Sequence, residues 1–270
     1  MINGFRRLRS RLVLVATSLG VASILAVPGT AVAQRSALDA VRERGVVLVG
    51  TTGDYRPFSF LDPRTGEYEG FDIDAARHLG EALGVEVRFV ATTWPSLIDG
   101  ILDGRYDIAM SGITRTLARV GSVGLTDPYA SLGKTALVRT ADRDRFTSLA
   151  EIDRAGVTIG VNPGGTNEAF VRTTLLHATV VVIDRNLAIP DAIAAGDVDV
   201  MITDNVEAVL VARERPVLHA VSPDQPYTRE DVGYMVRRDD QAFLNWLNLW
   251  LFQMRSTGAL ARLEARWLGR

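Results

Sequence analysis

Cysteine is absent from the 270 residues. Its absence excludes disulfide bridges, thiolate metal sites and a cysteine nucleophile, and it removes the residue to which a lipid anchor would be attached after export. Catalysis or binding must therefore use carboxylates, amides, hydroxyls and cations. We expect a protein that is not tethered to a membrane.

The chain also lacks an excess of charge and the common signatures of bound cofactors. It carries 30 basic and 32 acidic residues, for a net charge of −2, and its basic residues gather only near the N-terminus, so nothing resembles a nucleic-acid-binding surface. His78, His177 and His219 have no metal-ligand spacing, and no Ser-His-Asp arrangement or phosphate-binding loop is visible. We predict a small-molecule ligand, no metal and no cofactor.

Long apolar runs are confined to the first 33 residues. Four arginines precede an apolar run from Leu12 to Val27, and Ala31-Val32-Ala33 offers a cleavage site of small residues before Gln34. The run is shorter than the roughly 20 residues of a spanning helix, so this pattern is typical of a secretory signal peptide. We predict cleavage near Ala33 and a mature chain in the periplasm, with no membrane anchor.

Short apolar runs alternate with helical periods along the remaining residues. This alternation is typical of an α/β fold. The strands are expected at 46–49, 85–90 and 108–110, and the helices at 73–83 and 96–102.

A weak internal repeat indicates two similar halves. Residues 101–108 (ILDGRYDI) are echoed by residues 193–200 (IAAGDVDV), and each segment ends a helix on glycine and enters a strand. Gly and Pro interrupt the periodicity near 129–134 and 226–233, where we expect the chain to cross between the halves. The predicted division is a first lobe of 34–133 plus 231–270 and a second lobe of 134–230.

Several motifs together resemble those of a known family, the periplasmic amino-acid-type solute-binding proteins, and within it the periplasmic cyclohexadienyl dehydratases. The resemblance covers essentially the whole mature chain. It implies a two-lobed fold of the type II periplasmic-binding-protein class, each lobe a central sheet flanked by helices, with the ligand in the cleft between them. The motifs are TTGDYRPFS (51–59), GFDID (70–74), TWP (93–95), DIAMSGI (107–113), GKT (133–135), NPGGTNE (162–168) and TD (203–204).

The resemblance further implies a reaction that converts prephenate to phenylpyruvate, or arogenate to phenylalanine, with loss of carbon dioxide and water. Decarboxylation pushes electrons into the cyclohexadienyl ring as the C4 hydroxyl leaves, and aromatisation drives the step. The departing hydroxide needs a proton. One positioned general acid would contribute about 10²- to 10⁴-fold.

Glu168 is the candidate acid at this stage. We expect it in the first turn of a helix capped by Thr166, facing the cleft. The helix N-terminus lowers the pKa of such a carboxyl, whereas desolvation raises it, so burial must dominate for Glu168 to donate a proton. The alternative is that Glu168 only complements the helix dipole.

A cradle for the substrate carboxylate is expected around Arg119, at the spacing where the family places the arginine that pairs with it. A guanidinium holds a carboxylate through two parallel hydrogen bonds. Ser111, the Gly112 backbone and Thr114 would complete the cradle. The alternative for Arg119 is a solvated side chain at the start of a helix.

Lys134 and Asp204 bear on the choice of substrate. Lys134 could supply a second cation for the prephenate dianion or orient Glu168, or it could be a surface lysine in a linker. Asp204 is the family's usual partner for an α-amino group, which suits arogenate or an ordinary amino acid.

Tyr55 and Trp94 are predicted to stack on a flat ring, and Thr166 and Asn167 to contact the substrate. Lone aromatic residues are more often part of a core. The second reading of the whole chain is a non-catalytic amino-acid carrier that delivers its ligand to an ABC permease.

Overall fold

The computed structural model describes residue 1 and residues 35–269. Arg35–Arg270 form one compact unit. The predicted signal peptide lies outside the described residues. Among the residues described, no helix combines the length and the apolar character needed to cross a membrane.

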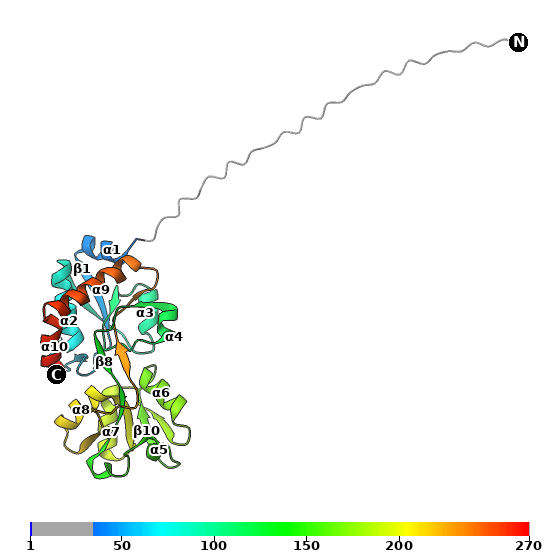
Figure 1. Ribbon diagram of the computed structural model, residues 1–270, viewed down its shortest axis with the longest axis vertical. Helices are drawn as coiled ribbons and strands as arrows, with labels where there is room; N and C mark the ends of the chain where they lie inside the picture. The colour runs from blue at the N-terminus through cyan, green and yellow to red at the C-terminus, as the bar shows by residue number, and fades with distance from the viewer. Residues whose placement is uncertain (2–34, 270) are drawn as a thin grey trace. The chain divides into compact units, whose positions relative to one another are not determined.

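The first of the two large sheets has the strand order β5-β1-β6-β15-β7. Strand β1 runs parallel to β5 and β6, whereas β15 returns from near the C-terminus and runs antiparallel to β6 and β7. In Figure 1 the helices of this half gather around β1. The strands are β1 (Val46–Thr51), β5 (Glu86–Ala91), β6 (Ile108–Ala109), β7 (Val123–Leu125) and β15 (Met235–Arg237); the helices are α1 (Ala37–Arg44), α2 (Phe71–Leu83), α3 (Leu97–Leu102), α4 (Leu117–Ser122), α9 (Gln241–Ser256) and α10 (Ala259–Trp267).

The second large sheet repeats this plan, with the order β11-β10-β12-β9-β13. Strands β10, β11 and β12 are parallel, and β9 is antiparallel to β12 and β13. In Figure 1 its helices gather around β10. The strands are β9 (Lys134–Arg139), β10 (Thr158–Val161), β11 (Thr179–Val182), β12 (Val200–Asp204) and β13 (Leu218–Val221); the helices are η1 (Thr140–Asp142), α5 (Leu149–Ile152), α6 (Thr166–Thr174), η2 (Asn186–Ala188), α7 (Ile189–Ala195) and α8 (Asn205–Glu214).

Both large sheets are apolar on their two faces, because helices cover both. Two buried clusters flank the first sheet, one around Val47 and Val49 and the other around Ala109 and Tyr106. The second sheet has a corresponding pair. This confirms the predicted fold class, in which each half is a central sheet flanked by helices.

Two short strand groups complete the fold. Strands β8 (Ala130–Leu132) and β14 (Glu230–Val232) pair antiparallel where the chain passes between the two large sheets. Strands β2 (Asp54–Tyr55), β3 (Ser59–Leu61) and β4 (Tyr68–Glu69) form a small antiparallel sheet. The exact lobe bounds given above stay a prediction.

The internal repeat has the same hydrogen bonds in both halves. Gly104 and Gly196 adopt the positive φ angles, 67° and 88°, that end helices in a left-handed turn. Three residues later, Asp107 accepts a hydrogen bond from the Leu48 amide of β1, and Asp199 accepts one from the Thr158 amide of β10. Each aspartate thus fastens its strand to the neighbouring parallel strand.

Candidate functional site

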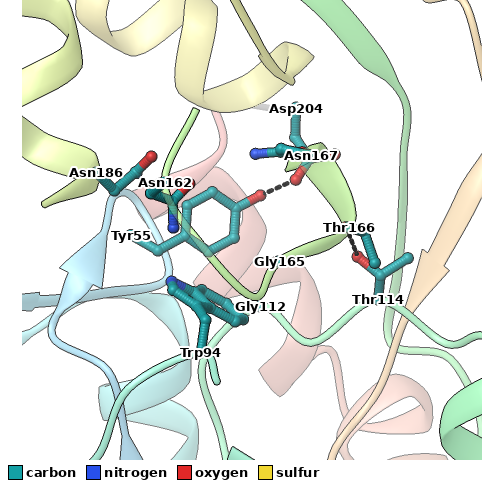
Figure 2. A pocket seen from close by; sticks show the side chains of 10 residues that line it. All are labelled: Tyr55, Trp94, Gly112, Thr114, Asn162, Gly165, Thr166, Asn167, Asn186 and Asp204. Atoms are coloured by element: carbon teal, nitrogen blue, oxygen red, sulfur yellow. Dashed lines mark hydrogen bonds between the residues drawn. The ribbon is translucent and has the colours of Figure 1, made fainter. Parts of the chain in front are cut away.

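A pocket lies between loops that follow strands of the two large sheets (Figure 2). Loops at the carboxyl ends of parallel strands are the usual ligand-binding position in α/β sheets. The lining residues are Tyr55, Trp94, Gly112, Thr114, Asn162, Gly165, Thr166, Asn167, Asn186 and Asp204.

Seven of the eleven residues predicted for the site line this cavity: Tyr55, Trp94, Gly112, Thr114, Thr166, Asn167 and Asp204. Ser111, Arg119, Lys134 and Glu168 are not in the lining. Asn186 was not predicted. It lies between the motifs at 162–168 and 203–204, in a short 3₁₀ turn that no periodicity marks.

Two aromatic rings form one wall. Tyr55 and Trp94 meet edge to face, with ring centroids 5.8 Å apart, and the Trp94 indole donates to Asp54 Oδ1 at 3.1 Å. Tyr55 is buried, and its hydroxyl donates a short hydrogen bond to Asp204 Oδ2, drawn as a dashed line in Figure 2. Burial and the nearby charge of Asp204 raise the pKa of Tyr55 well above its ordinary value, so this hydroxyl keeps its proton.

Lys134 is the only lysine in the chain, and its side chain is fully buried behind the pocket. Its Nζ lies 2.9 Å from Asp204 Oδ1, 3.1 Å from Thr166 Oγ1 and 3.1 Å from Glu230 Oε2. Burial alone would lower the pKa of Lys134, but the charges of Asp204 and Glu230 raise it above its ordinary value. Lys134 is therefore a buried cation, and the surface alternative is wrong.

Lys134 and Tyr55 together occupy both carboxylate oxygens of Asp204. A ligand ammonium that paired with Asp204 would have to share the carboxylate with these donors. Thr166, which we expected to cap its helix, is instead the first residue of α6 after Gly165. Its hydroxyl accepts from Lys134 and lies 3.2 Å from the Thr114 hydroxyl.

Arg119 lies in α4, half-buried, just outside the lining residues. Its Nη1 donates to the Thr114 carbonyl at 2.7 Å, and within residues 35–269 no carboxylate lies within 4 Å of the guanidinium. Burial lowers the pKa of Arg119, while the more distant charges of Glu230 and Asp204 raise it. A partly desolvated cation with a carbonyl partner is suited to receive a carboxylate.

Ser111 and the Gly112 amide are already engaged, so the predicted cradle needs correcting. The Ser111 hydroxyl is buried against Thr52, accepting from its amide at 3.1 Å. The Gly112 amide donates to Asp72 Oδ2 at 2.5 Å. Gly112 has a φ of +64° and packs against the Tyr55 ring, so it shapes the pocket wall without offering a donor.

The buried Asp72 side chain fixes the loop that contains Gly112. It is fully buried, and Oδ2 also accepts from the Tyr129 hydroxyl at 2.8 Å. Burial raises the pKa of Asp72 to about 7, although the hydrogen bonds from Gly112 and Tyr129 and the nearby Tyr234 hydroxyl act in the opposite direction.

Replacing Asp72 with Asn is expected to change how stability depends on pH. A carboxyl with a raised pKa stabilises the fold fully below its unfolded pKa of 3.8, and this contribution is lost as pH rises through about 7. With about 1.4 kcal/mol per pH unit for one proton, the wild type should lose about 2 kcal/mol relative to Asp72→Asn between pH 5 and 7. Urea unfolding at both pH values measures this, and parallel losses in the two proteins would contradict it.

Glu168 does not meet the requirement for a proton donor in this structure. Its carboxylate accepts from the Gly164 amide at 2.7 Å and from Arg172 Nε at 2.9 Å. The Gly164 hydrogen bond, with Arg172, lowers the pKa of Glu168 more than its slight burial raises it. We expected a cleft-facing carboxyl with a raised pKa; the structure corrects this, because the helix N-terminus and Arg172 hold an ionised carboxylate.

Glu207 has the properties that were expected of Glu168. It lies in the first turn of α8, directly after β12, and is 3% exposed. Burial, together with the charges of Asp204 and Asp54, raises the pKa of Glu207 to about 8, against the hydrogen bonds from Thr203 and Asn186. At neutral pH the carboxyl is therefore mostly protonated.

The sequence contains one signal for Glu207. It stands three residues after Asp204, in the first turn of the next helix that follows a buried strand, the same local position as Glu168 after β10. Glu207 contacts two residues around the pocket. Its Oε1 accepts from Asn186 Nδ2 at 2.8 Å, and its Oε2 bonds to the Thr203 hydroxyl.

Residues 47–270 match the family model of the bacterial extracellular solute-binding proteins, family 3. The chain is 42% identical over 236 residues to a cyclohexadienyl dehydratase of Pseudomonas aeruginosa, covering 87% of each protein. It is 27% identical over 254 residues to the L-cystine-binding protein TcyJ of Escherichia coli, covering 93% of this chain and 94% of that protein.

Solved structures of ancestral proteins are also similar. One is the ancestral amino acid-binding protein AncCDT-1, a precursor of cyclohexadienyl dehydratase, with a TM-score of 0.82 and 36% identity over 86% of this chain and all of that one. Another is the ancestral cyclohexadienyl dehydratase AncCDT-3, with a TM-score of 0.55 and 48% identity over 87% of this chain and 98% of that one. The chain belongs to the bacterial extracellular solute-binding proteins, family 3, with both amino-acid-binding proteins and a cyclohexadienyl dehydratase among its relatives.

Proposed function

We propose that this protein is a cyclohexadienyl dehydratase that converts prephenate to phenylpyruvate, or arogenate to phenylalanine. The single observation that carries the proposal is the buried, protonated carboxyl of Glu207 behind the pocket wall. The 42% identical dehydratase supports the same activity.

The proposed reaction is a decarboxylation coupled to loss of water. The C–C bond to the ring carboxylate breaks and its electron pair enters the ring, which becomes aromatic as the C4–O bond breaks. Glu207 gives its proton to the departing hydroxyl. Carbon dioxide and water leave, and the side chain of Glu207 remains as a carboxylate. Solvent then returns the proton to Glu207.

The remaining pocket residues hold and enclose the substrate. Arg119 and the Thr114 and Thr166 hydroxyls receive the side-chain carboxylate, and Tyr55 and Trp94 pack against the ring. Lys134 acts behind them, since it keeps Asp204 and Thr166 in place.

The proposed location of the protein rests on its family and on its N-terminal sequence. Family 3 proteins are extracellular solute-binding proteins, and the N-terminal sequence is typical of a secretory signal. We propose a periplasmic enzyme released by cleavage near Ala33. Its partner is its small-molecule substrate.

Purified residues 34–270 with prephenate test the proposal. Phenylpyruvate should appear as prephenate disappears, in equal amounts. No conversion at any pH between 6 and 9 would refute the enzyme.

An amino-acid carrier for an ABC permease is the second candidate, and Asp204 is the observation that favours it. A carboxylate beside the pocket suits an α-ammonium group, and TcyJ is an amino-acid-binding relative. Because Lys134 and Tyr55 already occupy Asp204, we expect weak binding of ordinary amino acids. Calorimetric titration with amino acids discriminates, since submicromolar affinity without prephenate turnover would establish the carrier.

Glu168→Gln is expected to keep prephenate turnover within about three-fold of wild type. The substitution removes an ionised carboxylate that is bound to Gly164 and Arg172. It should reduce stability by no more than about 1 kcal/mol, since Arg172 is half exposed. Initial rates of phenylpyruvate formation measure the effect, and a loss beyond 100-fold would return Glu168 to the role of acid.

A further inference from the structure

Asn186 is buried in the pocket wall with one polar atom lacking a partner. The residue is 3% exposed, and Figure 2 shows it at the same margin of the pocket as Asn162 and Tyr55. Its Oδ1 is buried and makes no hydrogen bond within the described part of the chain. An unpartnered buried carbonyl costs about 1–3 kcal/mol, so a ligand that donates to it is favoured.

The amide nitrogen of Asn186 joins the two sides of the pocket. Nδ2 donates to Glu207 Oε1 at 2.8 Å and to the backbone carbonyl of Asp54 at 3.1 Å. The Asp54 carbonyl can only accept, which fixes the orientation of the amide. Asp54 belongs to β2, and Glu207 follows β12 of the second large sheet, so one amide group bonds to both halves.

The free carbonyl matches the chemistry of the proposed substrate. As a dianion, prephenate has one hydrogen-bond donor, its C4 hydroxyl. A hydroxyl that donates its hydrogen to Asn186 Oδ1 keeps its lone pairs free to accept a proton. The proton comes from the carboxyl of Glu207, to which the amide nitrogen of Asn186 donates a hydrogen bond.

We propose that Asn186 is a positioning and substrate-orienting residue: its carbonyl receives the hydrogen of the departing hydroxyl, and its amide nitrogen fixes the carboxyl of Glu207 against Asp54. This inference rests on the proposed dehydratase function. It assigns the leaving hydroxyl to the Asn186 side of the pocket, and the carboxylate to the side of Thr114 and Arg119.

Removing Asn186 should also change the acidity of Glu207 in a predictable direction. The groups that face Glu207 are Asp54 and Tyr55 from β2, Asp204 and Thr203 from β12, and Asn186 from η2. The charges of Asp204 and Asp54 raise the pKa of Glu207, whereas the hydrogen bonds from Thr203 and Asn186 lower it. Loss of the Asn186 donor therefore raises this pKa further.

The test compares the pH profile of kcat for wild type, Asn186→Ala and Asn186→Asp. Asn186→Ala removes the acceptor and the donor, so kcat should fall about 10- to 100-fold and the alkaline limb of the profile should move to higher pH. Asn186→Asp keeps the size and an acceptor oxygen but places a carboxylate beside Glu207, so the limb should also move upward. Asn248→Leu, a substitution in α9 remote from the pocket, should leave the profile unchanged.

A shifted limb in both variants supports the assignment, because a merely structural loss lowers kcat without moving the profile. Wild-type turnover with unshifted limbs in both variants overturns this assignment alone. No wild-type turnover overturns the proposed function and this assignment with it.

Discussion

Glu207→Gln should lower kcat for prephenate by about 10²- to 10⁴-fold, the usual contribution of one positioned general acid. Glutamine keeps the shape of the side chain, and its amide can still accept from Asn186 and donate to Thr203. The change therefore removes the transferable proton and little else. Substrate affinity should stay within a few-fold, as measured by ligand titration of the intrinsic tryptophan fluorescence, to which Trp94 in the pocket contributes.

The free energy of unfolding of Glu207→Gln distinguishes loss of the transferable proton from misfolding of the variant. Replacing a buried carboxyl with a neutral amide removes a group that is costly to ionise, so at pH 8 and above Glu207→Gln should be at least as stable as wild type. Glu168→Gln is the matched control, since it makes the same chemical change in the first turn of α6. Retention of more than a tenth of wild-type kcat by Glu207→Gln would remove Glu207 from the reaction.

The alkaline limb of the wild-type profile follows from the same carboxyl. Glu207 donates only when protonated, and its pKa is raised to about 8. Turnover should thus be constant on the acid side of that value and fall as pH rises through it. Glu168, with its lowered pKa, would instead have lost its proton throughout the neutral range.

Lys134→Met should destabilise the protein by about 3–5 kcal/mol, the usual cost of removing one partner from a buried ion pair. The substitution leaves Asp204, and the partly buried Glu230, without the cation that compensates them. Urea unfolding at pH 7 measures the loss. Catalysis should suffer as well, because Asp204 and Thr166 would no longer be held.

A double substitution tests the cause of that loss. In Lys134→Met with Asp204→Asn, one uncompensated charge is also removed, so more than 1 kcal/mol of stability should return. Additive losses would show that Lys134 and Asp204 act independently. A loss below 1 kcal/mol in Lys134→Met alone would show that both carboxylates are well solvated.

Much of the fold was predictable because it depends on local patterns. The alternation of short apolar runs with helical periods predicted two α/β halves, and the glycines at 104 and 196 marked the equivalent turns. The resemblance of three separate motifs to those of the solute-binding family implied that Tyr55, Trp94 and Asp204 lie at the pocket, and all three line it. These are features of strand ends and turns, which a sequence specifies directly.

The choice between Glu168 and Glu207 depended on burial, which no local pattern reveals. Both residues stand in the first turn of a helix after a strand. Arg172 lies one helical turn from Glu168 and forms an ion pair with its carboxylate. Glu207 is instead covered by residues distant in sequence, including Asn186. The engagement of Ser111 and Gly112 by Thr52 and Asp72 is equally a tertiary contact.

The most direct test of the account is the initial rate of phenylpyruvate formation from prephenate at pH 7 by residues 34–270, in wild type, Glu207→Gln and Glu168→Gln. The account predicts rapid formation by wild type and Glu168→Gln and a loss of at least 100-fold in Glu207→Gln. Loss in Glu168→Gln with activity in Glu207→Gln would contradict the assignment of the acid, and no phenylpyruvate from any of the three would contradict the enzyme itself.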